Sequence, residues 1–269
     1  MHLKRWITGL VALPFLVFII YKGGVIFATV VSIVSLLSLW EYFRIVLGTE
    51  EKMLIGIPLL AFITGPLIIW TVYVKAFDLT LGLLAMNLIV SGLVSVTQFK
   101  SSPRVIETIK SQVQGIVYVP LFLSFLVLIR NGTEGMLWIA LLLCLIFAGD
   151  ISAYYFGSYL GRRKLAPAVS PGKTIEGAIG GLAANLAVGS LFKALFLPGM
   201  PWVAGIIFFL IVGIMGQAGD LFESALKRAS NIKDSGGLLP GHGGFLDRID
   251  ALLFAAPVVY LFKGYVFQA

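Results

Sequence analysis

Charged residues, cysteine and histidine are all scarce in this sequence. Asp, Glu, Lys and Arg make up only 12% of the 269 residues, while 59% are hydrophobic. A soluble domain carries about 25% charged residues, so an ordinary soluble globular protein is excluded. The single cysteine, Cys144, excludes an intrachain disulfide. With one cysteine and two histidines, His2 and His242, the sequence also lacks the Cys/His clusters that bind zinc.

Long uncharged runs dominate the chain instead. A membrane-spanning helix needs about 20 apolar residues. The runs that reach or approach this length are 6–21, 24–40, 53–74, 79–99, 111–129, 135–161 (interrupted by Asp150), 177–192, 194–219 and 251–262. We therefore predict an all-α polytopic integral membrane protein with about nine transmembrane helices. Lys4 and Arg5 precede the first run as in a signal peptide, but a second run follows at once, so we expect a retained first helix.

The positions of the basic residues predict the orientation. When the loops between these runs are assigned alternately to the two sides, most of the 20 Lys and Arg residues fall on the side of the N-terminus. By the positive-inside rule that side faces the cytoplasm. We predict a multi-pass protein of the cell (inner) membrane with a cytoplasmic N-terminus. The net charge of +7 comes from this face, and without a separate basic domain we expect no binding to nucleic acid.

The two halves of the chain differ in chemistry. Residues 1–130 hold about five of the predicted helices and few polar groups, which indicates a scaffold, although 99–114 is a candidate interfacial amphipathic helix. Residues 131–269 hold about four helices and two polar loops, 161–177 and 220–250, which we predict to be cytoplasmic and catalytic. Asp150 interrupts an apolar run, where a carboxylate must face a cavity or pair with a basic side chain.

The segment 220–250 contains the most unusual chemistry of the chain. Its nine charged residues are Asp220, Glu223, Lys227, Arg228, Lys233, Asp234, Asp247, Arg248 and Asp250. Asp247 and Asp250 share one face of a predicted helix, and a loop that folds back would bring Asp220 close to Asp247. A small number of carboxylates suits Mg²⁺. For any single residue, a surface loop with internal salt bridges is the simpler alternative.

Cations and glycines beside these carboxylates favour phosphate binding. Lys and Arg are the usual phosphate contacts, and glycines at 236, 237, 241, 243 and 244 allow backbone N–H groups to approach a phosphate. The segment 170–174 (SPGKT) is not a P-loop, because Pro167 stands where that motif needs glycine. Lys173 and Thr174 remain a candidate anion site at the start of a helix. The set favours phosphoryl or nucleotidyl transfer, in which a protein mainly positions and neutralises charge.

Two motifs resemble one known family. Residues 224–250 match, in order, the S-x2-K-R-x4-K-D, G-H-G-G and D-R-x-D elements of the phosphatidate cytidylyltransferases, also called CDP-diacylglycerol synthases. Residues 170–177 (SPGKTIEG) are similar to a second motif of that family, and they depart from it at Gly172, where a lysine is usual. The resemblance is most specific in residues 150–250, while length and hydropathy agree along the whole chain.

The resemblance implies an enzyme that converts CTP and phosphatidate into CDP-diacylglycerol and pyrophosphate with Mg²⁺, with a second cation as an option. The residues that it implies as catalytic are Asp220, Asp247, Lys227 and Arg248, and those implied as metal ligands are Asp220, Asp247 and Asp250. Substrate binding is implied for Lys173, Thr174, Ser224, Arg228, Lys233, His242, Gly243 and Gly244. Asp150, Glu176 and Glu223 would line the same polar cavity. The expected partners are CTP, phosphatidate and membrane lipid, and a homodimer is one possible assembly.

Other functions compete with this interpretation. A transporter or channel would suit an intramembrane carboxylate and broken helices, but the sequence shows no inverted repeat. A CDP-alcohol phosphotransferase also binds Mg²⁺ through aspartates, but its D-G-x2-A-R pattern is absent. A non-catalytic lipid-binding membrane protein is a third alternative. Release of pyrophosphate from CTP separates the predicted enzyme from the transporter. Replacing Asp247 with asparagine separates it from the lipid-binding protein, because the enzyme should lose nearly all transferase activity with its folding kept.

Overall fold

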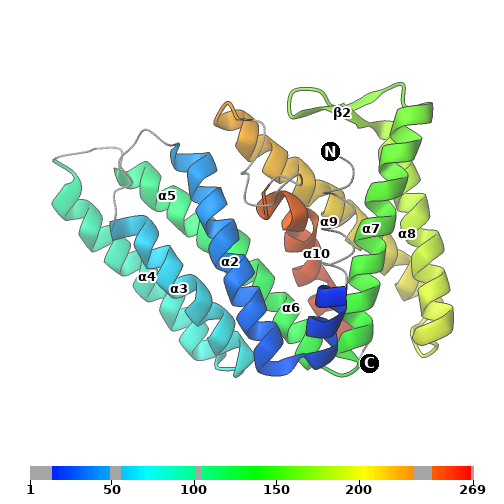
Figure 1. The fold of residues 1–269 in the computed structure, drawn as a ribbon, viewed down its shortest axis with the longest axis horizontal. Coiled ribbons are helices and arrows are strands. Elements are labelled where there is room, and N and C mark those ends of the chain that lie inside the picture. The colour runs from blue at the N-terminus through cyan, green and yellow to red at the C-terminus, as the bar shows by residue number, and fades with distance from the viewer. Residues whose placement is uncertain (1–13, 49–55, 101–104, 233–243, 268–269) are drawn as a thin grey trace. The chain divides into compact units, whose positions relative to one another are not determined.

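The all-α prediction is confirmed. The structure is a computed structural model that describes residues 14–48, 56–100, 105–232 and 244–267. Within these ranges the regular structure is helical except for one two-stranded hairpin (Figure 1). The predicted site residues Lys233, His242 and Gly243 lie outside the described ranges, as do Asp234 and the glycines at 236, 237 and 241.

The described elements follow the apolar runs of the sequence. Residues 14–22 are helical. They are followed by α2 (Gly24–Leu47), α3 (Gly56–Tyr73), α4 (Phe77–Gln98), α5 (Val105–Ile116), the π-helical turn η1 (Val117–Leu121) and α6 (Phe122–Asn131). The later elements are α7 (Gly135–Leu160), β1 (Lys164–Ala166), β2 (Ser170–Thr174), α8 (Ile175–Phe196), α9 (Trp202–Ala229) and α10 (Leu246–Tyr265).

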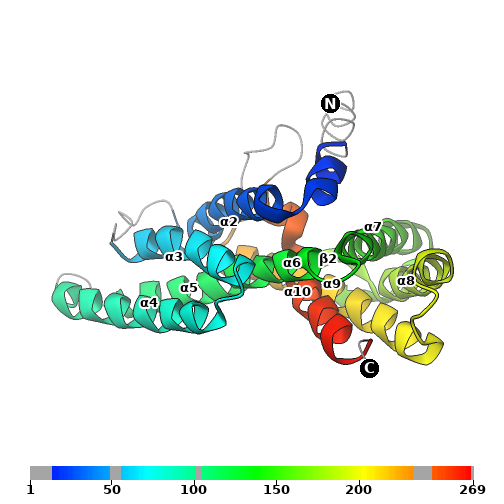
Figure 2. The ribbon, with the colours of Figure 1, turned by 90° about the horizontal axis from the view of Figure 1, so that it is seen from below.

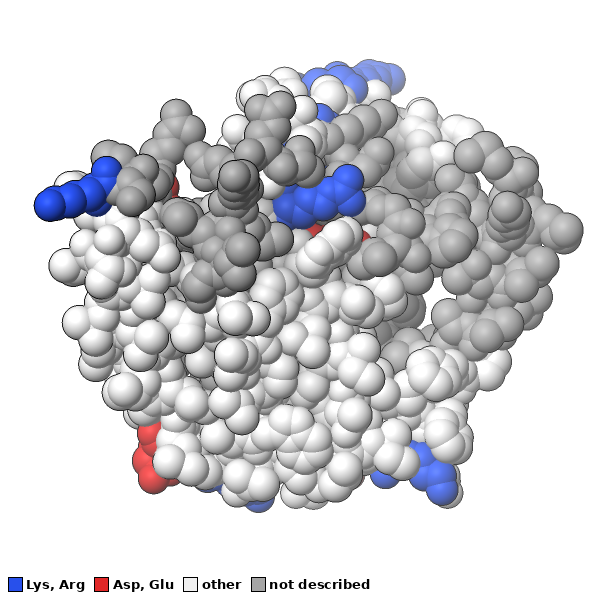
Figure 3. Space-filling model, turned by 60° about the vertical axis from the view of Figure 1, so that its left-hand side comes forward, with Lys and Arg blue, Asp and Glu red and all other residues white. Residues whose placement is uncertain are grey.

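Six of the described helical segments are long and apolar enough to cross a membrane: α2, α4, the continuous run 105–131, α7, α8 and α9. Helix α4 shows the consequence for the surface, because most of its large apolar side chains are exposed, including Leu81, Leu93 and Val96. In Figure 3 the middle of the visible face is uncharged. An apolar surface of this kind fits a multi-pass membrane protein. The total of nine spans stays a prediction.

The chain divides into two compact units. The first contains residues 1–131 and 229–248, and the second contains residues 132–228 and 249–269. In the first unit, α3 packs against α2, α4, α5 and α6. In the second unit, α7 and α8 pack along each other, as Figures 1 and 2 both show. Helix α10 begins in the first unit and continues into the second.

A buried polar network joins three helices of the first unit. The Asn87 amide donates to Thr64 Oγ1 at 3.0 Å, and the Gln112 amide donates to Asn87 Oδ1 at 2.7 Å. Ser91 donates to Gln112 Oε1 at 3.3 Å. All four side chains are buried. Because helices in lipid gain little from apolar contact alone, such hydrogen bonds help to specify how α3, α4 and α5 pack.

Glycines set the packing of the second unit. A Cβ added to Gly181 on α8 would lie 3.0 Å from the carbonyl oxygen of Gly149 on α7. A Cβ on Gly177 would lie 2.7 Å from the carbonyl oxygen of Ala153. Small residues at these positions allow the two backbones to approach closely, as membrane helix pairs commonly do. This contact brings the end of α7 beside the start of α8, where the β-hairpin is inserted.

Candidate active site

The β-hairpin is closed onto the start of α8. Thr174 is the N-cap of this helix, and its Oγ1 accepts the backbone N–H of Gly177 at 3.1 Å. The Glu176 carboxylate accepts the backbone N–H groups of Arg162 at 3.0 Å and Arg163 at 3.1 Å. The predicted helix start at Thr174 is therefore confirmed. The contacts of the Thr174 hydroxyl and of Glu176 hold the backbone of this loop, while their predicted substrate and cavity roles stay predictions.

The hairpin is tied to α9 by two polar contacts. Lys173 Nζ on β2 lies 2.6 Å from Asp220 Oδ2 on α9. The Arg228 Nε donates to the carbonyl oxygen of Val169 at 3.2 Å. The structure thus brings Lys173 and Asp220, 47 positions apart in the sequence, into direct contact.

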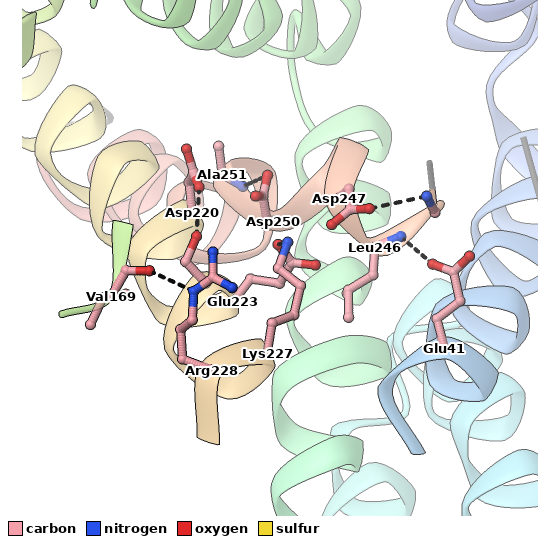
Figure 4. A network of polar contacts seen from close by, with 12 residues as sticks. Glu41, Val169, Asp220, Glu223, Lys227, Arg228, Leu246, Asp247, Asp250 and Ala251 are labelled. Carbon is pink, nitrogen blue, oxygen red and sulfur yellow. Dashed lines mark hydrogen bonds and ion pairs between the residues drawn. The ribbon is translucent and has the colours of Figure 1, made fainter. Parts of the chain in front are cut away.

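Helix α9 carries a polar face at its C-terminal end (Figure 4). Asp220, Glu223, Ser224 and Lys227 follow the spacing that places side chains on one side of a helix. Ser224 donates to Asp220 Oδ1 at 3.4 Å. Lys227 pairs with Glu223 at 2.7 Å, and the Glu223 side chain is only 1% exposed. This desolvated pair holds the Lys227 ammonium against Glu223, which lies one helical turn from Asp220.

Gly219 brings α10 against α9 at the level of Asp220. A Cβ on Gly219 would collide with the carbonyl oxygen of Asp250. Only glycine allows this approach, so the backbone of Asp250 lies directly against the residue that precedes Asp220. Asp250 Oδ1 accepts the N–H of Ala251 at 2.7 Å. The negative charge of Asp220 acts on Asp250, and Asp150 and Lys227 also contribute to its electrostatic environment.

Asp150 on α7 belongs to the same cluster. Its carboxylate experiences repulsion from Asp220 and attraction from Lys173. Carboxylates from α7, α9 and α10 therefore share one electrostatic environment with Lys173 and Lys227 in the second unit. The attraction from Lys173 agrees with the interpretation of Asp150 as the partner of a basic side chain, while its role in lining a cavity stays a prediction.

The donor chemistry of this cluster fits Mg²⁺. The side chains that repel one another are all carboxylates, and hard oxygen donors are the ligands that Mg²⁺ prefers. Among the described residues, no group of three or more His, Cys, Asp or Glu side chains is arranged to hold a metal ion. Mg²⁺ commonly takes only one or two protein carboxylates, together with substrate phosphates. Asp220 and Asp250 suit a site in which two protein carboxylates bind the ion together with substrate phosphates.

Asp247 and Arg248 lie in the first turn of α10, within the first unit. Asp247 Oδ2 accepts the backbone N–H of Gly244 at 3.0 Å, and the Arg248 N–H donates to the carbonyl oxygen of Phe245 at 3.0 Å. Asp247 therefore stabilises the start of its own helix. Because Asp220 belongs to the second unit, the predicted convergence of Asp220 and Asp247 on one ion stays a prediction.

Glu41 is the residue that the sequence analysis missed. It lies on α2 in the half that the sequence describes as scaffold, and it is fully buried. Its Oε2 accepts the backbone N–H of Leu246, the first residue of α10, at 2.8 Å. A signal for it existed, because an acidic residue directly after the apolar run 24–40 is costly beside a membrane segment and is a functional candidate by default.

These features define a helical membrane protein with a mixed cluster of carboxylates and cations suited to phosphates. Comparison with known proteins gives its family. The pattern of the cytidylyltransferase family matches residues 3–266, so the chain belongs to this family. The resemblance that residues 170–177 and 224–250 indicate is thereby confirmed.

Two relatives align along nearly the whole chain. The phosphatidate cytidylyltransferase of Bacillus subtilis (strain 168) is 30% identical over 264 residues, which cover 96% of each protein. That of Staphylococcus aureus (strain COL) is 32% identical over 262 residues, or 95% of this chain and 96% of the relative. A phosphatidate cytidylyltransferase of Synechocystis sp. is 45% identical over 134 residues, which cover 49% of this chain and 45% of the relative.

Proposed function

We propose that this protein transfers the cytidylyl group of CTP to phosphatidate and releases pyrophosphate, forming CDP-diacylglycerol. The names and full-length similarity of the Bacillus and Staphylococcus relatives support this activity. The observation that carries the proposal is the contact between Lys173 and Asp220, at a place where the charges of Asp150, Asp250 and Lys227 also interact. A site with both signs of charge suits an enzyme that must hold a polyanion and a metal ion together.

Charge neutralisation is the main task of the protein in this reaction. The phosphate of phosphatidate is already an anion, so its attack on the α-phosphorus of CTP needs no strong general base. Two anionic substrates repel each other, and the cations of the site would offset that repulsion. Lys173 and Lys227 are the described ammonium groups that would do so, with Arg228, Lys233 and Arg248 as further predicted phosphate contacts.

The carboxylates would hold Mg²⁺. Asp220 and Asp250 are the proposed ligands from the second unit, and Asp247 is a third proposed ligand. When bound, the ion would offset negative charge on the phosphates of CTP. Ser224 would orient the Asp220 carboxylate through their 3.4 Å hydrogen bond. Lys173, which contacts Asp220 directly, would exchange this carboxylate for a phosphate oxygen when the substrate binds.

The chemistry of the substrates favours a site at the cytoplasmic surface of the membrane. CTP is soluble in water and phosphatidate is held in lipid, so the two meet at the interface. The positive-inside rule places loops 161–177 and 220–250 in the cytoplasm together with the N-terminus. We therefore propose a multi-pass protein of the inner membrane whose active site opens to the cytoplasm.

An assay of the purified full-length protein tests the activity. The protein is incubated in mixed micelles with phosphatidate and CTP labelled at the α-phosphate, with and without Mg²⁺. We expect labelled CDP-diacylglycerol and an equal amount of pyrophosphate, both dependent on Mg²⁺. Diacylglycerol, which lacks the attacking phosphate, serves as the control substrate and should give no product.

The same assay separates the alternatives. A transporter would release no pyrophosphate from CTP. A CDP-alcohol phosphotransferase would instead consume CDP-diacylglycerol and an alcohol, and would release CMP. Either result, or the absence of labelled lipid under all conditions, would contradict the proposed function.

A further inference from the structure

The buried carboxylate of Glu41 connects α2 with the beginning of α10. Glu41 Oε2 and the backbone nitrogen of Leu246 lie 2.8 Å apart across 205 positions of the sequence (Figure 4). Both residues are 0% exposed and both belong to the first unit. The bond thus joins a scaffold helix to the first residue of the helix that carries Asp247 and Asp250.

The start of a helix needs such a partner. The first N–H groups of an α-helix have no acceptor within the helix, and a carboxylate at this end also interacts favourably with the helix dipole. Asp247 Oδ2 accepts the N–H of Gly244, and the acceptor of the Leu246 N–H is the Glu41 carboxylate. Removing Glu41 would leave the buried N–H of Leu246 without this acceptor, which typically costs about 1–3 kcal/mol.

The end of α2 that carries Glu41 is held firmly by other contacts. The neighbouring Tyr42 is fully buried, and its hydroxyl donates to the carbonyl oxygen of Ser111 at 3.0 Å. Gly115 leaves room for the Tyr42 ring, since a Cβ there would lie 2.7 Å from it. The ring of Phe43 packs edge-on against Tyr42 with 5.5 Å between centroids. Glu41 therefore stands on a fixed base that does not depend on α10.

We infer that Glu41 is a positioning residue that fixes the first turn of α10 and, through it, the carboxylates of Asp247 and Asp250. This inference rests on the proposed function for its effect on catalysis. Glu41 contacts the helix backbone and acts through the aspartates. Because catalysis is sensitive to displacements of about 1 Å, a helix start that shifts by this much would lower the rate without removing any reacting group.

Three variants of the full-length protein separate positioning from a general contribution to folding. Glu41→Ala removes the acceptor, and Glu41→Gln keeps an oxygen of the same reach. Gln112→Ala is the matched control: Gln112 is also 0% exposed and lies in the same unit, but it forms hydrogen bonds with Asn87 and Ser91. If Glu41→Ala does not fold, Glu41→Asp, which is one methylene shorter, replaces it.

Two measurements are made on each variant. Hydrogen exchange of the peptide that contains Leu246 reports whether the start of α10 is held, and kinetics with CTP and phosphatidate report kcat and KM. For Glu41→Ala we expect faster exchange at this peptide and a fall in kcat of about 10–100-fold, with KM changed less. Glu41→Gln should stay close to the wild type in both measurements. Gln112→Ala should lower the melting temperature but leave the exchange at the Leu246 peptide and the kinetic constants unchanged.

Several results would overturn the inference. Exchange at Leu246 that is unaltered in Glu41→Ala would show that the bond does not hold α10. Faster exchange with an unchanged kcat would show that catalysis does not require a fixed first turn of α10. A loss of kcat in Gln112→Ala equal to that in Glu41→Ala would show a general effect on folding. If the wild type itself makes no CDP-diacylglycerol, the proposed function fails, and the exchange data alone then decide whether Glu41 holds the helix.

Discussion

Lys173 Nζ and Asp220 Oδ2 lie 2.6 Å apart, so a cation of the β-hairpin is paired with a carboxylate of α9. The family resemblance gives these residues separate roles, one toward phosphate and one toward metal. Under the proposed function their contact would make the two roles interdependent, because a phosphate that attracted Lys173 would also release Asp220 for a cation. The charge of Asp150 acts on the same pair from α7.

Replacing Lys173 with methionine should impair catalysis more than folding. The variant removes the ammonium and keeps most of the side-chain volume. Loss of one group that stabilises developing charge typically lowers the rate about 100-fold, and we expect a fall of this size in kcat/KM for CTP. The ion pair is partly exposed, so its loss should change the free energy of unfolding by only about 0–1 kcal/mol. Steady-state kinetics and thermal unfolding measure the two effects.

Lys164→Met is the control for this prediction. Lys164 lies on β1 of the same hairpin, opposite Thr174, and its side chain is exposed. We expect it to keep nearly full activity. Equal losses in the two variants would mean that the hairpin needs positive charge in general and would remove the specific role of Lys173.

Gly219→Ala should separate α10 from α9. The added methyl group would collide with the carbonyl oxygen of Asp250, which is backbone and cannot turn away. Overpacking of this kind costs about 1–3 kcal/mol, and we expect a lower melting temperature together with a loss of activity. Gly264→Ala on α10 is the matched control, because a Cβ there meets nothing within 4 Å. Wild-type activity in Gly219→Ala would show that the close approach at Asp250 does not matter to the site.

Glu176→Ala should loosen the hairpin. The Glu176 carboxylate accepts the backbone N–H groups of Arg162 and Arg163, and its removal leaves the chain between α7 and α8 less restrained. We expect faster cleavage by trypsin after Arg162, Arg163 and Lys164 in limited proteolysis. Glu107→Ala, which removes an exposed ion pair with Lys110 in α5, should leave this cleavage rate unchanged. If both variants are cut at the wild-type rate, Glu176 does not restrain the hairpin.

The orientation in the membrane can be tested with single cysteines. Cys144 is first replaced by serine, and cysteine is then introduced as Gly172→Cys in the hairpin or as Gly199→Cys between α8 and α9. A Cβ at either glycine meets nothing within 4 Å, so neither change should disturb packing. A membrane-impermeant maleimide should label the Gly199→Cys variant in intact cells and the Gly172→Cys variant only in inverted vesicles. The opposite labelling pattern would contradict the predicted topology.

Local sequence patterns predict the helices well because membrane spans are specified by length and hydropathy. The apolar run 135–161 predicts α7 (Gly135–Leu160) almost to the residue. The run 111–129 predicts its helix less accurately, because the helical segment extends over 105–131. This segment includes part of the predicted amphipathic helix 99–114. It continues through a π-helical turn at Val117–Leu121, which includes Pro120. A proline interrupts the regular hydrogen bonding of a helix, and a π-turn can absorb that interruption.

Long-range contacts explain what the sequence did not predict. The hairpin strand Ser170–Thr174 contains proline and glycine, which are poor strand formers, and it depends on restraint by Glu176. The bond between Glu41 and Leu246 joins residues 205 positions apart, and no local pattern encodes it. Likewise, the sequence shows Gly219 only as one of several small residues in an apolar helix. Its close contact with the backbone of Asp250 is visible only in the structure.

The proposed role of the carboxylates is tested most directly by measuring cytidylyl transfer to phosphatidate as a function of Mg²⁺ concentration in the wild type, Asp220→Asn and Asp250→Asn. We expect no product after chelation, recovery when Mg²⁺ is added back, and a loss of activity of about 10²–10³-fold in each variant, with melting temperatures close to that of the wild type. Wild-type rates in both folded variants would contradict the central claim that the carboxylates of α9 and α10 hold the ion for this reaction.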